Sequence, residues 1–479
     1  MQSIDEIVSR LSNIQPETAP MYKELNDISC GRLFGFLFAN ELRYNSTQKE
    51  YMFYDGTVWK TDVGGMIAEQ HAKALFDALR KYIGDINDMK FFEGVMSLGD
   101  RAKRKRMIDD ARDFMPLTNE DLDADGNLFN CLNGTLDLTT FEFREHRAED
   151  LLSKVARVNY DPKAESKDFD RFIHQVMQDD EEKILFLQKI FGYSFLADAC
   201  EEKAYFLYGS TTRNGKSTLI ETICEMFGDY STHMQPESLA LRPKDSRTAS
   251  GDLARLVGIR FLNVAEIPRK MNLDVGLFKN LTGRDTITCR NLYEREFTFK
   301  PYFTLVVNTN FLPVVTDDTI FNSERVQVVT FDKHFTESEQ DKGLKTRLCS
   351  EENLSGILNW CILGLCEYRL NGLTPPDSVR KATEEYRNQS DKTKMFFDDC
   401  MTENTTSCLR AGEVYEHYTD WCRTSGYYAE GKKSFFEYLK GKGLLSPLGT
   451  INGRTARNVV KGYDFIDDDS ECISSNPFE

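Results

Sequence analysis

The sequence predicts an α/β protein of several domains, with a central parallel sheet between an α+β N-terminal region and a small C-terminal domain. At about 150 residues per domain, 479 residues suffice for about three domains. From Ala204 onward, short apolar strands alternate with helical stretches, which is typical of a parallel sheet. The expected regions are 1–120 (α+β), 121–195 (a preceding domain with a helical lead-in), 196–370 (the core), 380–463 (a small basic domain) and 464–479 (an acidic tail).

Composition excludes several classes of protein. With 40% hydrophobic and 29% charged residues, the chain has ordinary values for a globular protein. A net charge of −17 argues against a protein that coats nucleic acid over its whole surface, but it permits a local basic groove. The 12 cysteines are scattered without zinc spacing, so we expect buried reduced thiols. No apolar run is long enough to span a membrane, and the first residues do not form a secretory signal.

The N-terminal half combines a small sheet with helices. Residues 42–60 contain two aromatic-rich strands joined by polar turn residues. The basic run 101–106 is either a solvated helix face or a nucleic-acid contact. Residues 121–132 begin like a calcium loop, but Leu132 stands where the acidic ligand is required, so we expect a turn. A half-buried hairpin after Asn133 and two amphipathic helices, 168–177 and 184–196, then lead into the core.

The strongest motif is a glycine-rich loop between a strand and a helix. Gly209 and Gly215 enclose five residues before Lys216 and Ser217, one more than the usual P-loop spacing. Backbone N–H groups of such a loop bind phosphate oxygens; the lysine neutralises phosphate charge and the hydroxyl holds Mg²⁺. The expected nucleotide-binding residues are Gly209, Ser210, Thr211, Thr212, Arg213, Asn214, Gly215, Lys216, Ser217 and Thr218.

Two later strands end in polar residues that suit the same site. The strand 260–264 is followed by Glu266, a carboxylate that can reach Mg²⁺ or the attacking water. The strand 303–307 is followed by Asn308 and Asn310, amides able to hydrogen-bond the terminal phosphate or its water. We assign catalytic roles to Lys216, Glu266 and Asn308, and metal binding to Ser217 and Glu266.

Two basic elements are candidate DNA contacts. Residues 286–299 read as two alternating strands whose polar tip holds Arg290, Tyr293 and Arg295, groups that stack on bases and pair with phosphates. Lys279, at the end of the preceding helix, is a weaker candidate. Near the C-terminus, a helix followed by a hairpin that turns at Asn452-Gly453 is typical of a winged helix, although a protein-protein module is the alternative. Its candidate DNA-binding residues are Lys432, Lys433, Lys440, Arg454 and Arg457.

The stretch from about Ala204 to Phe331 resembles the superfamily III helicases, in the branch of phages, plasmids, mobile islands and poxvirus-type primase-helicases. The resemblance rests on five ordered blocks, namely GSTTRNGKST, LVGIRFLNVAEI, LFKNLTGRDTITCRNLYEREFTFKP, FTLVVNTNFLPVV and DDTIFNSERVQVVTF, and more weakly on the segment before them. It implies an ATP-driven homo-hexamer with a modified AAA+ core that pulls single-stranded DNA through its pore. Arg325 matches the family's finger arginine, Asn308 its sensor, and Glu266 its acidic residue.

Two departures from the family pattern concern the residues beside that site. Ala265 stands where many relatives have a second acid, so Glu266 serves both metal and water, or the metal relies on Ser217. Glu324 stands where relatives often have a second arginine.

We expect a replicative DNA helicase of a phage, plasmid or mobile element in the bacterial cytoplasm, acting on single-stranded, forked or origin DNA beside a separate primase. The alternatives are an origin-remodelling ATPase without processive unwinding and a non-enzymatic initiator.

Overall fold

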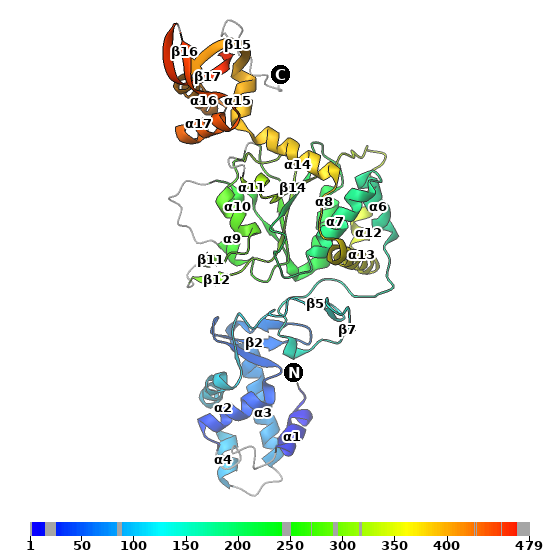
Figure 1. Ribbon diagram of the computed structural model, residues 1–479. Helices are drawn as coiled ribbons and strands as arrows, with labels where there is room; N and C mark the ends of the chain where they lie inside the picture. The colour runs from blue at the N-terminus through cyan, green and yellow to red at the C-terminus, as the bar shows by residue number, and fades with distance from the viewer. Residues whose placement is uncertain are drawn as a thin grey trace.

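A computed structural model describes residues 2–14, 25–83, 89–241, 251–269, 271–290, 296–315, 319–425, 427, 429–451 and 453–466. Figure 1 shows three parts one after another: the N-terminal helices and small sheet, the central sheet with its helices, and a small domain at the C-terminal end. The long helix α14 leads from the central part to the C-terminal domain (Figure 1). No helix within the described ranges is both long enough and apolar enough to cross a membrane.

The N-terminal part packs helices against a four-stranded sheet of order β3-β2-β1-β4, as the α+β prediction expects. Its basic run lies on one of these helices, where Arg104 is buried and bonded to Glu69 and to two backbone carbonyls, while Lys103 pairs with Asp27. Part of that run therefore stabilises the fold. The elements are α1 (Ile4–Asn13), α2 (Asp27–Phe38), β1 (Leu42–Asn45), β2 (Glu50–Tyr54), β3 (Trp59–Thr61), α3 (Met66–Tyr82), α4 (Met89–Ser97), α5 (Arg101–Asp110) and β4 (Pro116–Leu117).

A three-stranded antiparallel sheet and two helices precede the central sheet and share its hydrophobic core. The expected hairpin is present as β5 (Leu128–Cys131), β6 (Gly134–Asp137) and β7 (Phe143–Arg144), followed by α6 (Lys167–Met177) and α7 (Glu181–Tyr193). Buried residues of these elements belong to one cluster with residues of the central part. The buried Arg260 fastens the two parts, because it donates to the carbonyls of Phe195 and Leu128.

The central sheet has five parallel strands in the order β14-β8-β13-β10-β9. Every residue of β13 is buried, as expected for a strand paired on both sides and covered on both faces. The sequence predicted four of these strands and missed the polar edge strand β9. The strands are β8 (Ala204–Tyr208), β9 (Ser231–Met234), β10 (Phe261–Ala265), β13 (Thr304–Thr309) and β14 (Val326–Thr330).

Helices and a hairpin surround this sheet. They are α8 (Lys216–Phe227), α9 (Gly251–Ala254), α10 (Val275–Thr282), the hairpin β11 (Ile287–Cys289)–β12 (Phe297–Phe299), α11 (Thr319–Asn322), α12 (Leu344–Leu348) and α13 (Glu351–Asn371). Because parallel strands all point the same way, the loops after their carboxyl ends gather at one edge of the sheet.

The C-terminal domain follows the order helix, strand, two helices and two strands. Its sheet has the order β15-β17-β16, with the long hairpin β16–β17 turning at the predicted place, although Asn452 lies outside the described residues. β17 reaches Phe465, so it includes Asp464, which the sequence placed in the tail. After the linking helix α14 (Asp377–Ser390), the elements of the domain are α15 (Lys392–Cys400), β15 (Met401–Arg410), α16 (Ala411–Thr424), α17 (Lys432–Gly441), β16 (Leu445–Ile451) and β17 (Arg454–Phe465).

Candidate functional site

The glycine-rich loop connects β8 to α8 at the carboxyl edge of the central sheet. Gly209 allows no side chain, because an added Cβ would lie 2.3 Å from Asn214 Nδ2 and 2.9 Å from Lys216 Nζ. Gly215 precedes α8 with a φ of 84°, and a Cβ there would lie 2.5 Å from Val176. The buried Asn214 donates to the Thr211 carbonyl at 2.6 Å, a bond across the loop that accommodates its extra residue. Residues 210–213 are exposed.

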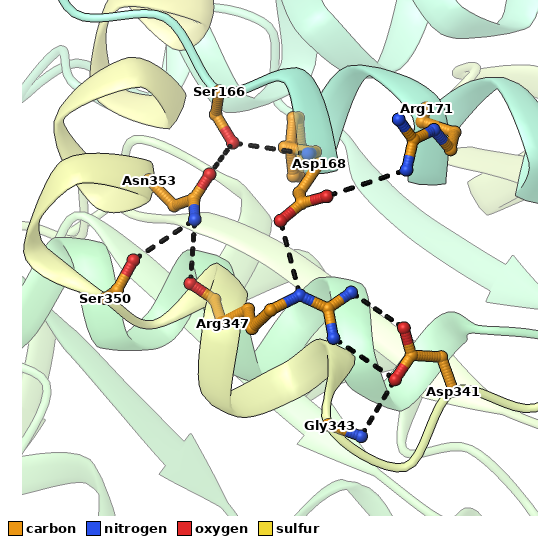
Figure 2. Close-up of polar contacts among 9 residues, drawn as sticks. Ser166, Asp168, Arg171, Asp341, Gly343, Arg347, Ser350 and Asn353 are labelled. Carbon is orange, nitrogen blue, oxygen red and sulfur yellow. Dashed lines mark hydrogen bonds and ion pairs between the residues drawn. The ribbon is translucent and has the colours of Figure 1, made fainter.

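Helix α6 packs against the loop, and its first turn is held by ion pairs. Its residues Phe172 and Val176 lie against Gly215. Figure 2 shows Arg347 of α12 between two carboxylates: its Nε donates to Asp168 at 3.3 Å, and its Nη2 donates to Asp341 at 2.7 Å. This network joins α6 to the segment that follows the central sheet.

Lys216 lies in the first turn of α8 and is buried. Its Nζ donates to Asn310 Oδ1 at 2.7 Å and lies 3.5 Å from the Gly209 carbonyl oxygen. Burial lowers the pKa of Lys216 to about 8, because the described surroundings offer neutral oxygens rather than a carboxylate. A bound phosphate would favour the charged form of this lysine again.

Glu266 and Asn308 lie next to each other at the same edge. β10 and β13 pair so that Ala265 stands opposite Asn308, and the Glu266 N–H donates to the Asn308 carbonyl at 3.0 Å. Glu266 is exposed and has a φ of 58°, a left-handed conformation that is unusual for glutamate and concentrates at functional sites. The predicted acidic residue therefore lies at the edge that carries the P-loop.

Of the two amides near the end of β13, Asn310 and not Asn308 contacts Lys216. The sequence assigned the sensor role to Asn308, which is the fifth residue of β13, paired with Leu207, and only 8% exposed. Asn310 is the first residue beyond the strand, and its amide oxygen accepts from Lys216. Because a lysine only donates, this bond leaves the Asn310 amide N–H group free to face a phosphate or water.

The two residues predicted to hold a metal ion, Ser217 and Glu266, both lie at this edge of the sheet. Within the described ranges, no three His, Cys, Asp or Glu side chains are grouped as metal ligands. Ser217 is exposed in the first turn of α8, and Glu266 is exposed after β10, so a cation here would need phosphate oxygens as further ligands.

Arg325 lies at the opposite edge of the sheet, directly before β14. Its Nη2 donates to Glu202 at 2.6 Å and its Nη1 donates to the Thr282 hydroxyl at 3.1 Å, while its side chain is 18% exposed. β14 pairs with β8 in register from Val326 with Ala204 to Thr330 with Tyr208. At about 3.3 Å per strand residue, Arg325 is about 20 Å from the level of the P-loop. It cannot reach a nucleotide bound to its own P-loop.

Three family models match segments of the chain. Residues 32–178 match the family "D5 N terminal like", residues 207–325 a "Family of unknown function (DUF5906)", and residues 388–468 the family "Poxvirus D5 protein-like". A "Putative helicase" of Acanthamoeba polyphaga mimivirus is 28% identical over 381 residues, covering 75% of this chain and 38% of the relative. One of Frog virus 3 is 26% identical over 273 residues, covering 53% and 28%. The chain belongs to the D5-type superfamily III primase-helicase family.

These curated relatives are named as putative helicases, and the D5-type chain spans about a third of their length. Among solved structures, the apo structure of the NrS-1 C terminal region aligns with a TM-score of 0.49 and 11% identity, over 88% of this chain and 96% of that one.

The candidate DNA contacts of the D5-type core lie on and beside the hairpin β11–β12. Arg290 follows β11 directly and is exposed, whereas Tyr293 and Arg295 lie outside the described residues. Lys279 of α10 donates to the Thr319 hydroxyl, and its carbonyl faces Arg325 Nη1 at 3.5 Å, so its side chain holds α10 to α11. The role of Lys279 in DNA contact stays a prediction.

The basic residues of the C-terminal domain line α17 and the hairpin after it. Lys433 forms an ion pair with Glu437 one helical turn away, and Lys432 Nζ lies 5.7 Å from the centre of the Tyr415 ring. The other candidates are exposed as well; the set is Lys432, Lys433, Lys440, Arg454 and Arg457.

Sequence reasoning missed three contacts made by the P-loop, by Lys216 and by Arg325. Asn310 was noted at the strand tip but not chosen, since only the pairing of β13 reveals where the strand ends. Glu202, the partner of Arg325, lies 123 positions away in the chain. His334, which contacts the P-loop backbone, lies 122 positions from its partner, and neither pairing has a local signal.

Proposed function

We propose that this chain is the ATP-driven motor of a DNA helicase that unwinds duplex DNA during replication of a viral or mobile genome. The observation that carries the proposal is the meeting of Lys216 and Asn310 at the carboxyl edge of the parallel sheet, beside Glu266. Glycine loop, buried lysine, strand-end amide and strand-end carboxylate are the parts that phosphoryl transfer to water requires.

Each group at this edge has a distinct task when ATP is bound. The N–H groups of residues 209–218 hold the phosphates, and Lys216 neutralises charge that develops on them. Asn310 orients the terminal phosphate or the attacking water, and Glu266 accepts a hydrogen bond from that water. Ser217 and Glu266 are exposed on the loop side, which fits Mg²⁺, an ion that supplies positive charge to the phosphate oxygens.

The position of Arg325 supports a closed ring of six copies. An arginine about 20 Å from its own P-loop can serve ATP hydrolysis only in a neighbouring subunit. The strand order β14-β8-β13-β10-β9, with β13 between the P-loop strand and the Glu266 strand, supports a modified AAA+ core. In such a ring the Glu202 carboxylate holds the arginine until a neighbour's phosphate replaces it.

Two elements are proposed to contact DNA. The hairpin β11–β12 grips single-stranded DNA in the pore, with Arg290, Tyr293 and Arg295, which lie between its two strands in the sequence, as the contacting residues. The C-terminal domain follows the winged-helix order, with α17 as the helix that enters a groove and β16–β17 as the wing. Lys432, Lys433 and Lys440 lie on that helix, and Arg454 and Arg457 on the wing. The two named viral relatives favour a DNA virus, with the primase in another part of the protein or a separate chain.

The decisive test combines ATP hydrolysis with strand displacement. Lys216→Ala should reduce DNA-stimulated ATPase by about 10³-fold or more, because it removes the buried positive charge at the P-loop. The wild-type protein with ATP and Mg²⁺ should displace a labelled strand from a forked substrate. A wild-type ring that hydrolyses ATP but displaces no strand would instead identify an origin-remodelling ATPase. ATPase activity that survives in Lys216→Ala would contradict the nucleotide site itself.

A further inference from the structure

The segment after β14 runs along the P-loop and holds it from outside. Phe331 N–H donates to the Tyr208 carbonyl at 2.7 Å, where the loop begins. At the tip, His334 Nδ1 lies 2.9 Å from the Thr212 carbonyl oxygen, and Phe335 N–H donates to the Arg213 carbonyl at 2.8 Å. Because a carbonyl only accepts, His334 carries its proton on Nδ1 in this contact.

These contacts fix the direction of two peptide groups of the loop. In a planar trans peptide, the C=O of one residue and the N–H of the next point in opposite directions. The Thr212 and Arg213 carbonyls face the segment after β14, so the N–H groups of Arg213 and Asn214 point away from it. Arg213 has a φ of 58°, the left-handed conformation with which successive N–H groups converge on an anion.

The segment that carries His334 is itself well anchored. Glu339 accepts from Lys333 Nζ at 2.7 Å and from the N–H of Thr336 at 2.8 Å, so the backbone between these positions is held as a turn. His334 is exposed at the rim of this turn. A fixed segment can impose its geometry on the exposed loop residues 210–213.

We infer that His334 is a positioning residue for nucleotide binding: it holds the Thr212 peptide so that the Arg213 N–H group faces the phosphates. The inference rests on the proposed function, since it concerns the same nucleotide site. His334 itself does not touch the nucleotide. It acts on affinity through the loop, with no part in the hydrolysis step.

His334→Ala should weaken binding of both ATP and ADP by about three- to tenfold, the effect of one hydrogen bond, with kcat unchanged. Both nucleotides should be affected alike, because a P-loop of this kind holds the phosphates that they share. His334→Asn should restore most of the affinity, since its side-chain amide N–H can occupy the place of Nδ1–H. Affinity is measured with a fluorescent ATP analogue displaced by ATP or ADP, and kcat and KM by phosphate release.

Glu337→Ala is the matched control, because Glu337 is exposed on the same segment. It should bind both nucleotides as the wild type does. Wild-type affinity in His334→Ala, no recovery in His334→Asn, or an equal loss in Glu337→Ala would each overturn the inference. If Lys216→Ala is inactive while His334→Ala binds normally, only this inference fails; an active Lys216→Ala would refute the proposed function.

Discussion

The two ends of the parallel strands differ in whether their candidate site residues meet within one chain. At the carboxyl edge, the P-loop, Glu266 and Asn310 come together within one chain, with Lys216 and Asn310 joined at 2.7 Å. At the amino edge, Arg325 bonds to Glu202 and Thr282 and lies about 20 Å from the level of its own P-loop. We expect this contrast if one edge binds the nucleotide and the other edge serves the nucleotide of a neighbour.

Removing Arg325 tests the amino edge and should have the largest effect. Arg325→Ala should lower ATPase by about 10³- to 10⁵-fold, the usual range for an arginine that stabilises charge in the transition state. Arg325→Lys should also fail, because an ammonium group lacks the planar fork of a guanidinium. Nucleotide binding should remain, since the P-loop lies at the other edge. Phosphate release and nucleotide binding are measured on the same preparations.

Mixing shows whether the arginine acts across a subunit boundary. Inactive Lys216→Ala subunits and inactive Arg325→Ala subunits should recover part of the ATPase when they assemble together, because some interfaces then combine an intact P-loop with an intact arginine. Glu202→Gln separates this role from a purely structural one: it should keep the ATPase, whereas a structural ion pair would fail with either partner removed. Mixed hexamers without any recovery would speak against action in trans.

Asn310 and Asn308 provide a comparison within the carboxyl edge. Asn310→Ala should lower kcat by about 10²- to 10³-fold, as removal of one polar group aimed at developing charge does. Asn308→Ala should change kcat little, because its bond to Glu266 comes from the backbone carbonyl, which the substitution retains. Loss of its buried amide should instead lower the midpoint temperature of thermal unfolding. If Asn308→Ala lowered kcat more than Asn310→Ala does, the sensor role would belong to Asn308.

The asparagine pair also shows what the sequence could predict. The apolar run before Asn308 predicted the strand, but hydrogen bonds to β8 and β10 extend it to Thr309 and move its end by two residues. Strand ends depend on neighbours in space, so polarity along the chain pointed to both amides but could not show that Asn310 is the one that contacts Lys216. The edge strand β9 was missed for a related reason: its sequence, Ser231–Met234, has little apolar character and forms a strand only beside β10.

The strand, loop and helix around Lys216 were predictable because their residues are contiguous. The glycines, the lysine and the hydroxyl follow one another at nearly the usual spacing, and the strand before them and the helix after them follow from local periodicity. The partners of Arg325 and of the P-loop backbone were not predictable, since Glu202 and His334 reach them only through the fold. Contacts across more than a hundred positions leave no local pattern.

The smallest expected effect is a pH dependence of ATP affinity that comes from the proton on Lys216. Burial lowers the pKa of this lysine to about 8 in the empty site, and a bound phosphate should raise it again. A group that binds its proton more tightly in the complex makes affinity fall as pH rises through the pKa of the free protein. ATP affinity should therefore change little between pH 7 and about 8 and then fall by up to about tenfold per pH unit, until the pKa of the complex is reached. Titrations with a fluorescent nucleotide from pH 7 to 9.5 measure this slope.

Lys216→Arg is the control, because an arginine stays protonated throughout this range and should remove the slope whatever its absolute affinity. A slope that persists in Lys216→Arg would assign the titration to another group, and a flat wild-type profile would mean that the lysine keeps its proton in the empty site.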